Sequence, residues 1–257
     1  MSYLGALAVV GLCTALAVAS AWLVGRLVPV ENRKRHHEVG SPVFSQVGVM
    51  ISVLLAFVFS EVWGEYRTAA LAINGECAAL HGAAILANAV PDGQGLPVDR
   101  AIAVYTQTVI TSEWPMMADR HRSPAAAHAL GDTMRAAVRM NVSRPVDLAT
   151  QNQILSLLAQ AHANRETRTF QVTQGMPGFM WLMLIIITAV LVGFVVFSGA
   201  ESPTHMVLAG LYAASAAMVL VLVRMLDFPF EGALAIPDTD FVKMFGEVAA
   251  LARGAGP

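Results

Sequence analysis

Long apolar runs alternate with polar stretches along the chain, and four of the runs are long enough to cross a lipid bilayer. A membrane-spanning helix needs about 20 predominantly apolar residues. Runs of this kind lie at residues 3–30, in the first part of 43–67, at 179–199 and at 205–225. The pattern predicts an all-α, multi-pass membrane protein with four transmembrane helices. A cleaved signal peptide begins with basic residues, and none precedes the first run. We therefore expect the first run to be retained as a helix.

The second run differs from the others in how it ends. Between Val43 and Arg67 the sequence turns from apolar to polar without a proline or glycine break long enough to stop a helix. The residues that follow, 68–90, are rich in alanine and contain no proline. We therefore predict one helix that crosses the membrane and continues into water. Such a helix can line a pore and also couple the pore to a soluble domain.

The segment between the second and third runs has ordinary polarity and predicts a soluble helical domain. A turn is expected at 91–95, followed by a helix over 98–122 that Pro115 kinks or ends. Ser123 and Pro124 are typical of a helix start, and a last helix over 147–171 leads back to the membrane. The predicted organisation is transmembrane helices one and two in 1–64 with a basic loop at 31–42, the soluble domain in 65–176, transmembrane helices three and four in 177–226, and a C-terminal tail in 227–257.

Composition supports the membrane assignment and excludes some classes of function. Of the 257 residues, 56% are hydrophobic and 13% are charged, which is about half the charged share of a typical soluble domain. The net charge of −2 provides no basic surface for nucleic acid. No nucleophile, base and orienting group are spaced as catalysis requires, so we expect no enzymatic activity.

Small residues recur at every fourth position in two of the predicted spans. Such stripes let another helix approach closely, although an alanine-rich composition produces them as well. The stripes are Gly11, Ala15 and Ala19 in the first span, and Ala209, Ala213 and Ala217 in the fourth.

Four short stretches of the chain are similar to known sequences. Leu54–Phe57 with Trp63–Tyr66 lies in the second run, and Asp227–Gly232 follows the fourth. Pro29–Arg33 precedes the second run, and Glu113–Pro115 lies in the central segment. The latter two resemble a bacterial bestrophin-like family, and the former two resemble the second transmembrane helix of the bestrophin anion channels and the segment after their fourth helix. The resemblance as a whole covers about residues 29–241.

This resemblance implies an apolar neck in an ion pore, formed by the second transmembrane helix. Carried onto this chain, the neck residues are Val49, Val53 and Phe57. Their four-residue spacing places them on one face of a helix, and a ring of such faces in an oligomer gates a pore by dewetting. Without the resemblance, packing against a neighbouring helix or contact with lipid explains the same spacing.

The chain also departs from the bestrophin pattern. Glu65 stands where bestrophins have an arginine, and Met50 stands where they have a proline within the neck. In an oligomer, Glu61 and Glu65 form two acidic rings at the pore mouth, and acidic rings favour cations. The implied anion selectivity is therefore contradicted locally, and a solvated helix face is the alternative interpretation of both residues.

Carboxylates follow the last apolar run, at the place where bestrophins bind calcium. The candidates for an ion or clasp site are Asp227, Glu231, Asp238 and Asp240. A calcium site needs six or more oxygen ligands, and the acidic run of the family is reduced here to Ala-Leu-Ala-Ile-Pro. We therefore expect no cofactor and assign no metal ligand, with calcium as the one metal to consider.

The leading functional hypothesis is an oligomeric ion channel in the inner membrane, gated at the neck on the second transmembrane helix. Its expected partners are the lipid bilayer, further copies of the chain and small inorganic ions, with no nucleic acid. The alternative is a non-conducting membrane scaffold or sensor whose helical domain binds a partner. The channel and scaffold hypotheses differ in whether the protein forms an oligomer that conducts ions.

Orientation in the membrane is not decided by the charges that flank the spans. The resemblance implies a cytoplasmic helical domain. The basic residues Arg33, Lys34 and Arg35 would normally mark the first loop as cytoplasmic instead. A similar number of basic residues is expected near helix ends on the opposite side, namely Arg67, Arg165, Arg168, Arg224 and Lys243.

Overall fold

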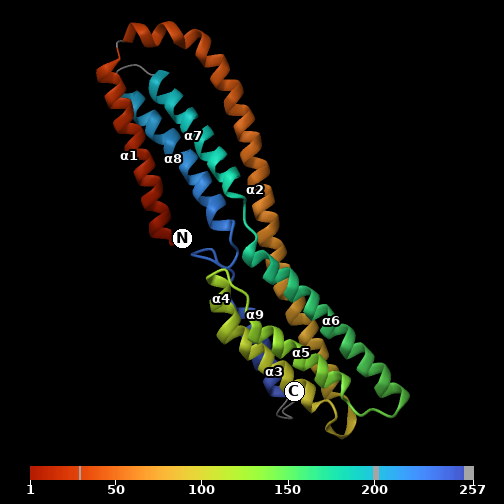
Figure 1. The fold of residues 1–257 in the computed structure, drawn as a ribbon. Coiled ribbons are helices and arrows are strands. Elements are labelled where there is room, and N and C mark those ends of the chain that lie inside the picture. The colour runs from red at the N-terminus through yellow and green to blue at the C-terminus, as the bar shows by residue number, and fades with distance from the viewer. Residues whose placement is uncertain (29, 199–202, 252–257) are drawn as a thin grey trace. The chain divides into compact units, whose positions relative to one another are not determined.

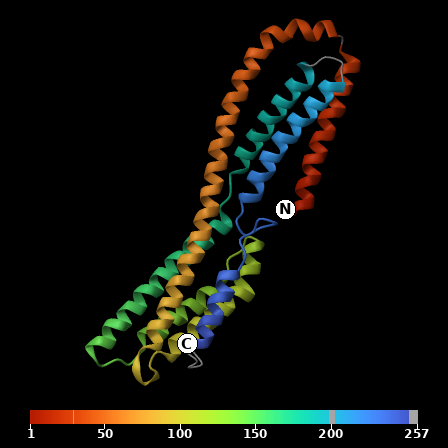
Figure 2. The ribbon, with the colours of Figure 1, turned by 180° about the vertical axis from the view of Figure 1, so that it is seen from behind.

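The computed structural model describes residues 1–28, 30–198 and 203–251, without the side chains of residues 30–41. In these residues every regular element is a helix, which confirms the predicted all-α class (Figures 1 and 2). The chain forms two compact units. The membrane unit comprises Met1–Gly64 and Gly175–Asp227, and the helical unit comprises Glu65–Gln174 and Phe228–Pro257.

The membrane unit contains the apolar helices. These are α1 (Tyr3–Leu27), the first part of α2 (Val30–Asn88), α7 (Gly178–Ser198) and α8 (Pro203–Leu226). Within the described part of the chain, these four helices are long and apolar enough to cross a membrane. The prediction of four transmembrane helices is therefore confirmed.

Helices α1 and α8 approach each other closely because small residues line their contact. A Cβ atom on Gly210 would lie 2.9 Å from the side chain of Val18. The stripe predicted in the fourth span, Ala209, Ala213 and Ala217, is buried. The stripe predicted in the first span is exposed instead, because α1 turns Ala17 and Ala21 inward.

The expected continuous helix is confirmed. Helix α2 has 59 residues, the first of which belong to the membrane unit and the last to the helical unit (Figure 1). It begins earlier than the sequence indicates. The segment 31–42, expected to be a loop, lies within the helix, and Pro42 is an internal residue. Proline removes one backbone hydrogen bond but does not always end a helix. The basic side chains of this segment lie outside the described residues.

The helical unit packs further helices against the second part of α2. A short 3₁₀ turn, Pro91–Gly93, follows the end of α2 where the sequence predicts a turn. The remaining elements are α3 (Leu96–Thr108), the π-helix η2 (Val109–Glu113), α4 (Trp114–Ala118), α5 (Pro124–Val138), α6 (Pro145–Thr173) and α9 (Thr239–Leu251).

Pro115 explains why the helix predicted over 98–122 is divided into three. Proline has no N–H, so it cannot continue the regular hydrogen-bond ladder, and a π-turn over Val109–Glu113 precedes it. Helix α4 ends at Ala118, and Arg120 adopts a left-handed backbone with φ of 62°. The predicted start of the next helix is confirmed, because the Ser123 hydroxyl accepts a hydrogen bond from the Ala126 N–H at 3.3 Å.

Candidate pore-lining face and a buried charge cluster

The predicted neck residues lie on an exposed side of α2. Successive α-helical residues are turned by about 100°, so these three share a strip about 80° wide. Val49, Val53 and Phe57 are 63%, 51% and 70% exposed. In a membrane, an exposed apolar strip contacts lipid, further copies of the chain or, in an oligomer, the water of a pore.

The packed side of the same helix lies on nearly the opposite face, about 160° around from the neck strip. Its buried side chains are Ile51, Val58 and Val62. Phe44 extends this side, because its ring stacks on Phe194 of α7 at 4.5 Å between centroids and lies 6.3 Å from the ring of Tyr212 on α8. Helix packing inside the membrane unit therefore turns the neck residues outward.

The neck strip is polar at both ends. Gln46 and Ser60 are exposed and lie within about 20° of the centre of the strip. Glu61 is exposed and Glu65 is half-buried. On a regular helix they lie about 80° and 120° from the centre of the strip, so they flank the neck face and do not continue it.

The four candidate carboxylates after α8 have different surroundings. Asp227 is buried, and its oxygens accept hydrogen bonds from the Met176 N–H at 2.8 Å and the Trp181 indole at 3.2 Å. Glu231 pairs with Arg120. Asp238 is half-buried and Asp240 is exposed. Within residues 1–28, 30–198 and 203–251, no group of three or more His, Cys, Asp or Glu side chains is placed to hold a metal ion.

Two of the stretches that carried the sequence resemblance meet in the helical unit. The Trp114 ring packs edge-on against Phe230 at 5.7 Å between centroids, and it lies 5.6 Å from Phe241 of α9. Beside them, Arg120 stacks over the Phe228 ring at 3.4 Å and donates from Nε to Glu231 at 2.9 Å. These contacts fix the chain after α8 against α4.

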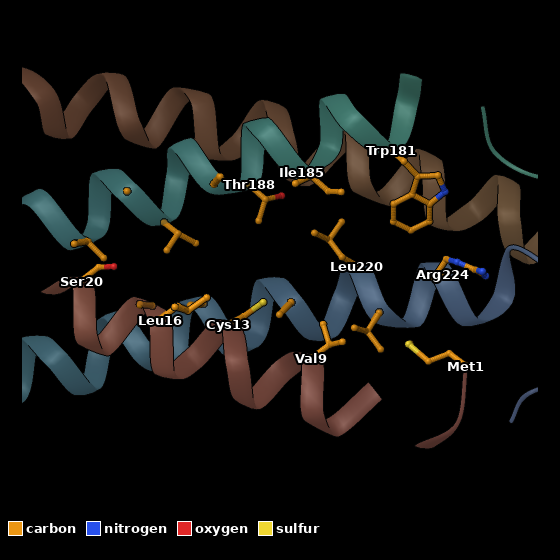
Figure 3. A pocket seen from close by; sticks show the side chains of 18 residues that line it. Met1, Val9, Cys13, Leu16, Ser20, Trp181, Ile185, Thr188, Leu220 and Arg224 are labelled. Atoms are coloured by element: carbon orange, nitrogen blue, oxygen red, sulfur yellow. The ribbon is translucent and has the colours of Figure 1, made fainter. Parts of the chain in front are cut away.

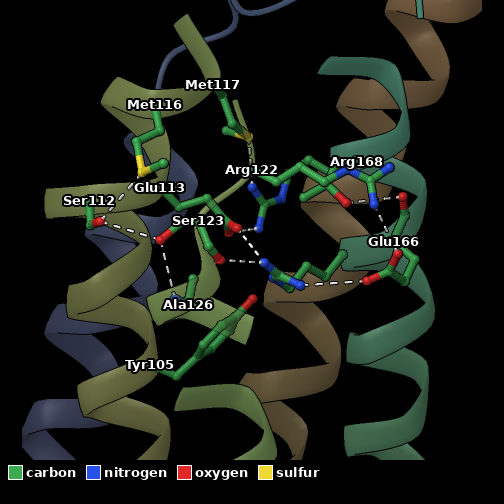
Figure 4. Close-up of polar contacts among 12 residues, drawn as sticks. Tyr105, Ser112, Glu113, Met116, Met117, Arg122, Ser123, Ala126, Glu166 and Arg168 are labelled. Carbon is green, nitrogen blue, oxygen red and sulfur yellow. Dashed lines mark hydrogen bonds and ion pairs between the residues drawn. The ribbon is translucent and has the colours of Figure 1, made fainter. Parts of the chain in front are cut away.

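A cluster of charged side chains lies in the core of the helical unit, and Figure 4 shows Tyr105, Glu113 and Arg168 within it. The Arg168 guanidinium lies 5.7 Å from the centre of the Trp114 ring. Arg168 of α6 is fully buried and donates from Nε to Glu76 of α2 at 2.8 Å. It also donates from Nη2 to Glu113 at 2.9 Å. Arg165, one turn earlier, pairs with the second oxygen of Glu113. We call Glu76, Tyr105, Glu113, Arg165 and Arg168 the buried charge cluster.

The cluster is electrically balanced, with two carboxylates against two guanidinium groups. The Tyr105 hydroxyl donates to Glu76, and burial, followed by the charge of Glu76, raises the pKa of Tyr105 well above its usual value. The nearby carboxylates keep the pKa of Arg168 above its usual value despite the opposing effect of burial. The cluster therefore ties α2, α3, the π-turn and α6 together through charged hydrogen bonds.

Comparison with known protein families gives a direct result. A family model described as "Bestrophin-like domain" matches residues 11–241. The chain belongs to the Bestrophin-like family. None of the curated proteins matches it.

Solved structures share the fold of this bestrophin-like chain at low sequence identity. A bacterial Bestrophin homolog from Klebsiella pneumoniae is 12% identical, with a TM-score of 0.75 over 96% of this chain and 99% of that chain. A single-substitution variant of that homolog is 12% identical, with a TM-score of 0.74 over 95% and 99%. A structure described as a membrane protein is 13% identical, with a TM-score of 0.75 over 96% and 99%.

Sequence reasoning missed the buried charge cluster of this bestrophin-like protein. Arg165 and Arg168 were expected near the ends of helices at the membrane, but they are 4% and 0% exposed and serve the core. A signal was present in the sequence. The apolar face of α6, which contains Ile154 and Leu158, continues at helical spacing through Arg165 and Arg168. A charge that interrupts an apolar stripe indicates a buried partner of opposite charge.

Proposed function

We propose that this Bestrophin-like protein is an oligomeric ion channel whose pore is lined by α2 from several copies. The apolar neck is formed by Val49, Val53 and Phe57, and it closes the pore by dewetting. The observation that carries the proposal is the direction of these side chains. They are exposed on the face of α2 opposite the one that packs in the membrane unit.

The polar ends of the neck strip favour water over lipid as its neighbour. Gln46 and Ser60 are 14 positions apart, which is about 21 Å along a helix. The hydrocarbon core of a bilayer is about 30 Å thick. If the strip faced lipid, at least one of these polar side chains would lie inside the hydrocarbon without a water partner. In a pore, both contact water on either side of a short apolar neck.

Adjacent residues provide a matched test of the neck. Val53 lies at the centre of the strip and Leu54 lies about 100° away, while both are exposed, at 51% and 40%. In liposomes that contain the purified protein, Val53→Ser should raise ion flux because a hydroxyl lets water enter the neck. A tenfold rise corresponds to a barrier lower by about 1.4 kcal/mol. Leu54→Ser should leave the flux near that of the wild type.

Several outcomes would refute the channel proposal. A purified protein that is monomeric in mild detergent cannot place several copies of α2 around one axis. Flux that is absent, or that responds equally to Val53→Ser and Leu54→Ser, would support the scaffold or sensor hypothesis instead.

The proposed permeant ion rests on the resemblance to bestrophins and is opposed by a charge near the neck. We propose anion conduction, which the resemblance to bestrophins supports, and Glu61 opposes it because an exposed carboxylate one turn beyond Phe57 attracts cations. Glu61→Gln should therefore raise the permeability of chloride relative to potassium, measured as a shift in reversal potential. A reversal potential equal to that of the wild type, or shifted the opposite way, would show that Glu61 does not lie at the pore mouth.

We also propose that the protein lies in the inner membrane with the helical unit in the cytoplasm. The support is the resemblance alone, since the flanking basic residues do not favour one orientation. Labelling of intact cells with a membrane-impermeant thiol reagent, at a cysteine introduced on the exposed surface of α6, tests this directly. Labelling without permeabilisation would show that the helical unit lies on the opposite side of the membrane from the cytoplasm.

A further inference from the structure

The membrane unit contains a large groove among α1, α7 and α8, away from the neck strip. Its volume is about 750 Å³, within the range of small-molecule and cofactor sites. Figure 3 shows Leu16 and Cys13 of α1, Ile185 and Thr188 of α7, and Leu220 of α8 around the empty space. Its walls are mostly apolar, so the groove suits a hydrocarbon ligand.

Small residues create the groove. Helix α8 holds α1 closely through Gly210 and its neighbouring alanines, whereas α7 faces the space with Ala189 and Gly193. Among the residues that the structure describes, and apart from the nearby backbone of α7 and the two chain neighbours, no atom lies within 4 Å of the position that a Cβ on Gly193 would take. The groove is therefore open where α7 carries its smallest side chains.

One end of the groove is polar. Trp181 of α7 and Arg224 of α8 are both at this end in Figure 3, and both line the groove. The Trp181 indole donates to Asp227 at 3.2 Å, which holds the ring at this end. Tryptophan and arginine near the ends of transmembrane helices are typical of the membrane–water interface. A guanidinium group is also well suited to hydrogen-bond a phosphate.

The length of the groove matches one lipid tail. On α8 it extends from Ala213 to Arg224, positions 11 apart, or about 16 Å of helix. One leaflet of a bilayer has about 15 Å of hydrocarbon, half of the total thickness. A helix from a second copy fits less well, because a rod 10 Å wide and 16 Å long occupies about 1,250 Å³, more than the groove contains.

We infer that the groove binds one acyl chain of an anionic phospholipid from the surrounding bilayer, with the lipid phosphate at Arg224. The tail lies between α1 and α7 along α8, and the headgroup lies beside Trp181. The lipid completes the packing of the membrane unit where its own side chains are too small to do so. This inference does not depend on whether the protein conducts ions.

Native mass spectrometry of the full-length protein tests the inference. Protein extracted in mild detergent and incubated with phosphatidylglycerol should retain one lipid per chain. Ala189→Phe fills the groove and should abolish retention, whereas Val190→Phe is the matched control, because Val190 is exposed and does not line the groove. Gly193→Leu is a second filling variant for use if Ala189→Phe does not give monodisperse protein.

The charge of the headgroup is tested separately. Wild-type protein should prefer phosphatidylglycerol to phosphatidylcholine with identical tails, and Arg224→Gln should reduce that preference by about tenfold, as expected for the loss of a charge-assisted hydrogen bond. Absence of retained lipid in the wild type, or equal loss in Ala189→Phe and Val190→Phe, would overturn the inference. So would a change of oligomeric mass in Ala189→Phe without any bound lipid, which would indicate a second copy in the groove.

Discussion

Removal of Arg168 should be among the most destabilising single changes in the helical unit. The side chain is fully buried and donates to Glu76 from two nitrogens, at 2.8 and 3.2 Å, and to Glu113 at 2.9 Å. The substitution Arg168→Met keeps much of the volume and removes the charge. It leaves two buried carboxylates opposite one guanidinium group, that of Arg165.

The expected magnitude follows from the burial of the remaining charges. Removal of one partner from a buried ion pair costs about 3–5 kcal/mol of folding free energy, because the other partner stays desolvated. For a unit of this size, 1 kcal/mol lowers the melting temperature by roughly 2–4 °C. Arg168→Met should therefore lower the melting temperature by roughly 10 °C.

The measurement is thermal unfolding of the purified protein in detergent, followed by tryptophan fluorescence. Trp114 lies 5.7 Å from the Arg168 guanidinium and packs on Phe230, so its signal reports on this core. Arg122→Met is the matched control. Arg122 pairs with Glu166 at 3.5 Å on the surface of the same unit, and exposed pairs of this kind contribute about 0.2–1 kcal/mol.

A double substitution tests the pairwise interaction itself. Glu76→Gln removes the carboxylate that Arg168 neutralises, so the double variant with Arg168→Met should lose less stability than the sum of the two single variants. Coupling between residues in contact amounts to about 0.5–3 kcal/mol. Equal effects of Arg168→Met and Arg122→Met, or strictly additive effects in the double variant, would refute the reasoning.

Two further carboxylates give predictions of stability. Burial raises the pKa of Asp99 to about 7. The folded protein therefore keeps a proton that the unfolded chain releases above about pH 4, so stability falls as pH rises from 4 to 7. Asp99→Asn removes this loss, and its melting temperature relative to wild type should be higher at pH 8 than at pH 5; a pH-independent difference would contradict this. Asp227→Asn should cost about 1–3 kcal/mol, because Met176 and Trp181 donate to different oxygens of Asp227 and the amide nitrogen that replaces one of them cannot accept a hydrogen bond. Exposed Asp240→Asn is its control in thermal unfolding, and equal melting temperatures would contradict the prediction.

The amino-acid sequence was sufficient for the arrangement along the chain. Hydrophobic run length depends on the thickness of the bilayer, so the four spans follow from composition over about 20 residues. Continuous helicity through the end of the second run, the Ser123 cap and the division near Pro115 depend on near neighbours only. The predicted start of α2 was wrong, because charged residues favour a helix as readily as a loop and Pro42 is tolerated inside α2.

Which side chains face one another was decided only by tertiary structure. The two small-residue stripes have the same spacing, yet that of α8 is buried and that of α1 is exposed, because the choice of face depends on the partner helix. Glu76, Glu113 and Arg168 are separated by up to 92 positions, and no local pattern specifies that they share one desolvated site. The groove likewise arises where three helices fail to meet. Period and composition determine which segments form helices, whereas the packing of distant segments determines where charge is buried and where space remains.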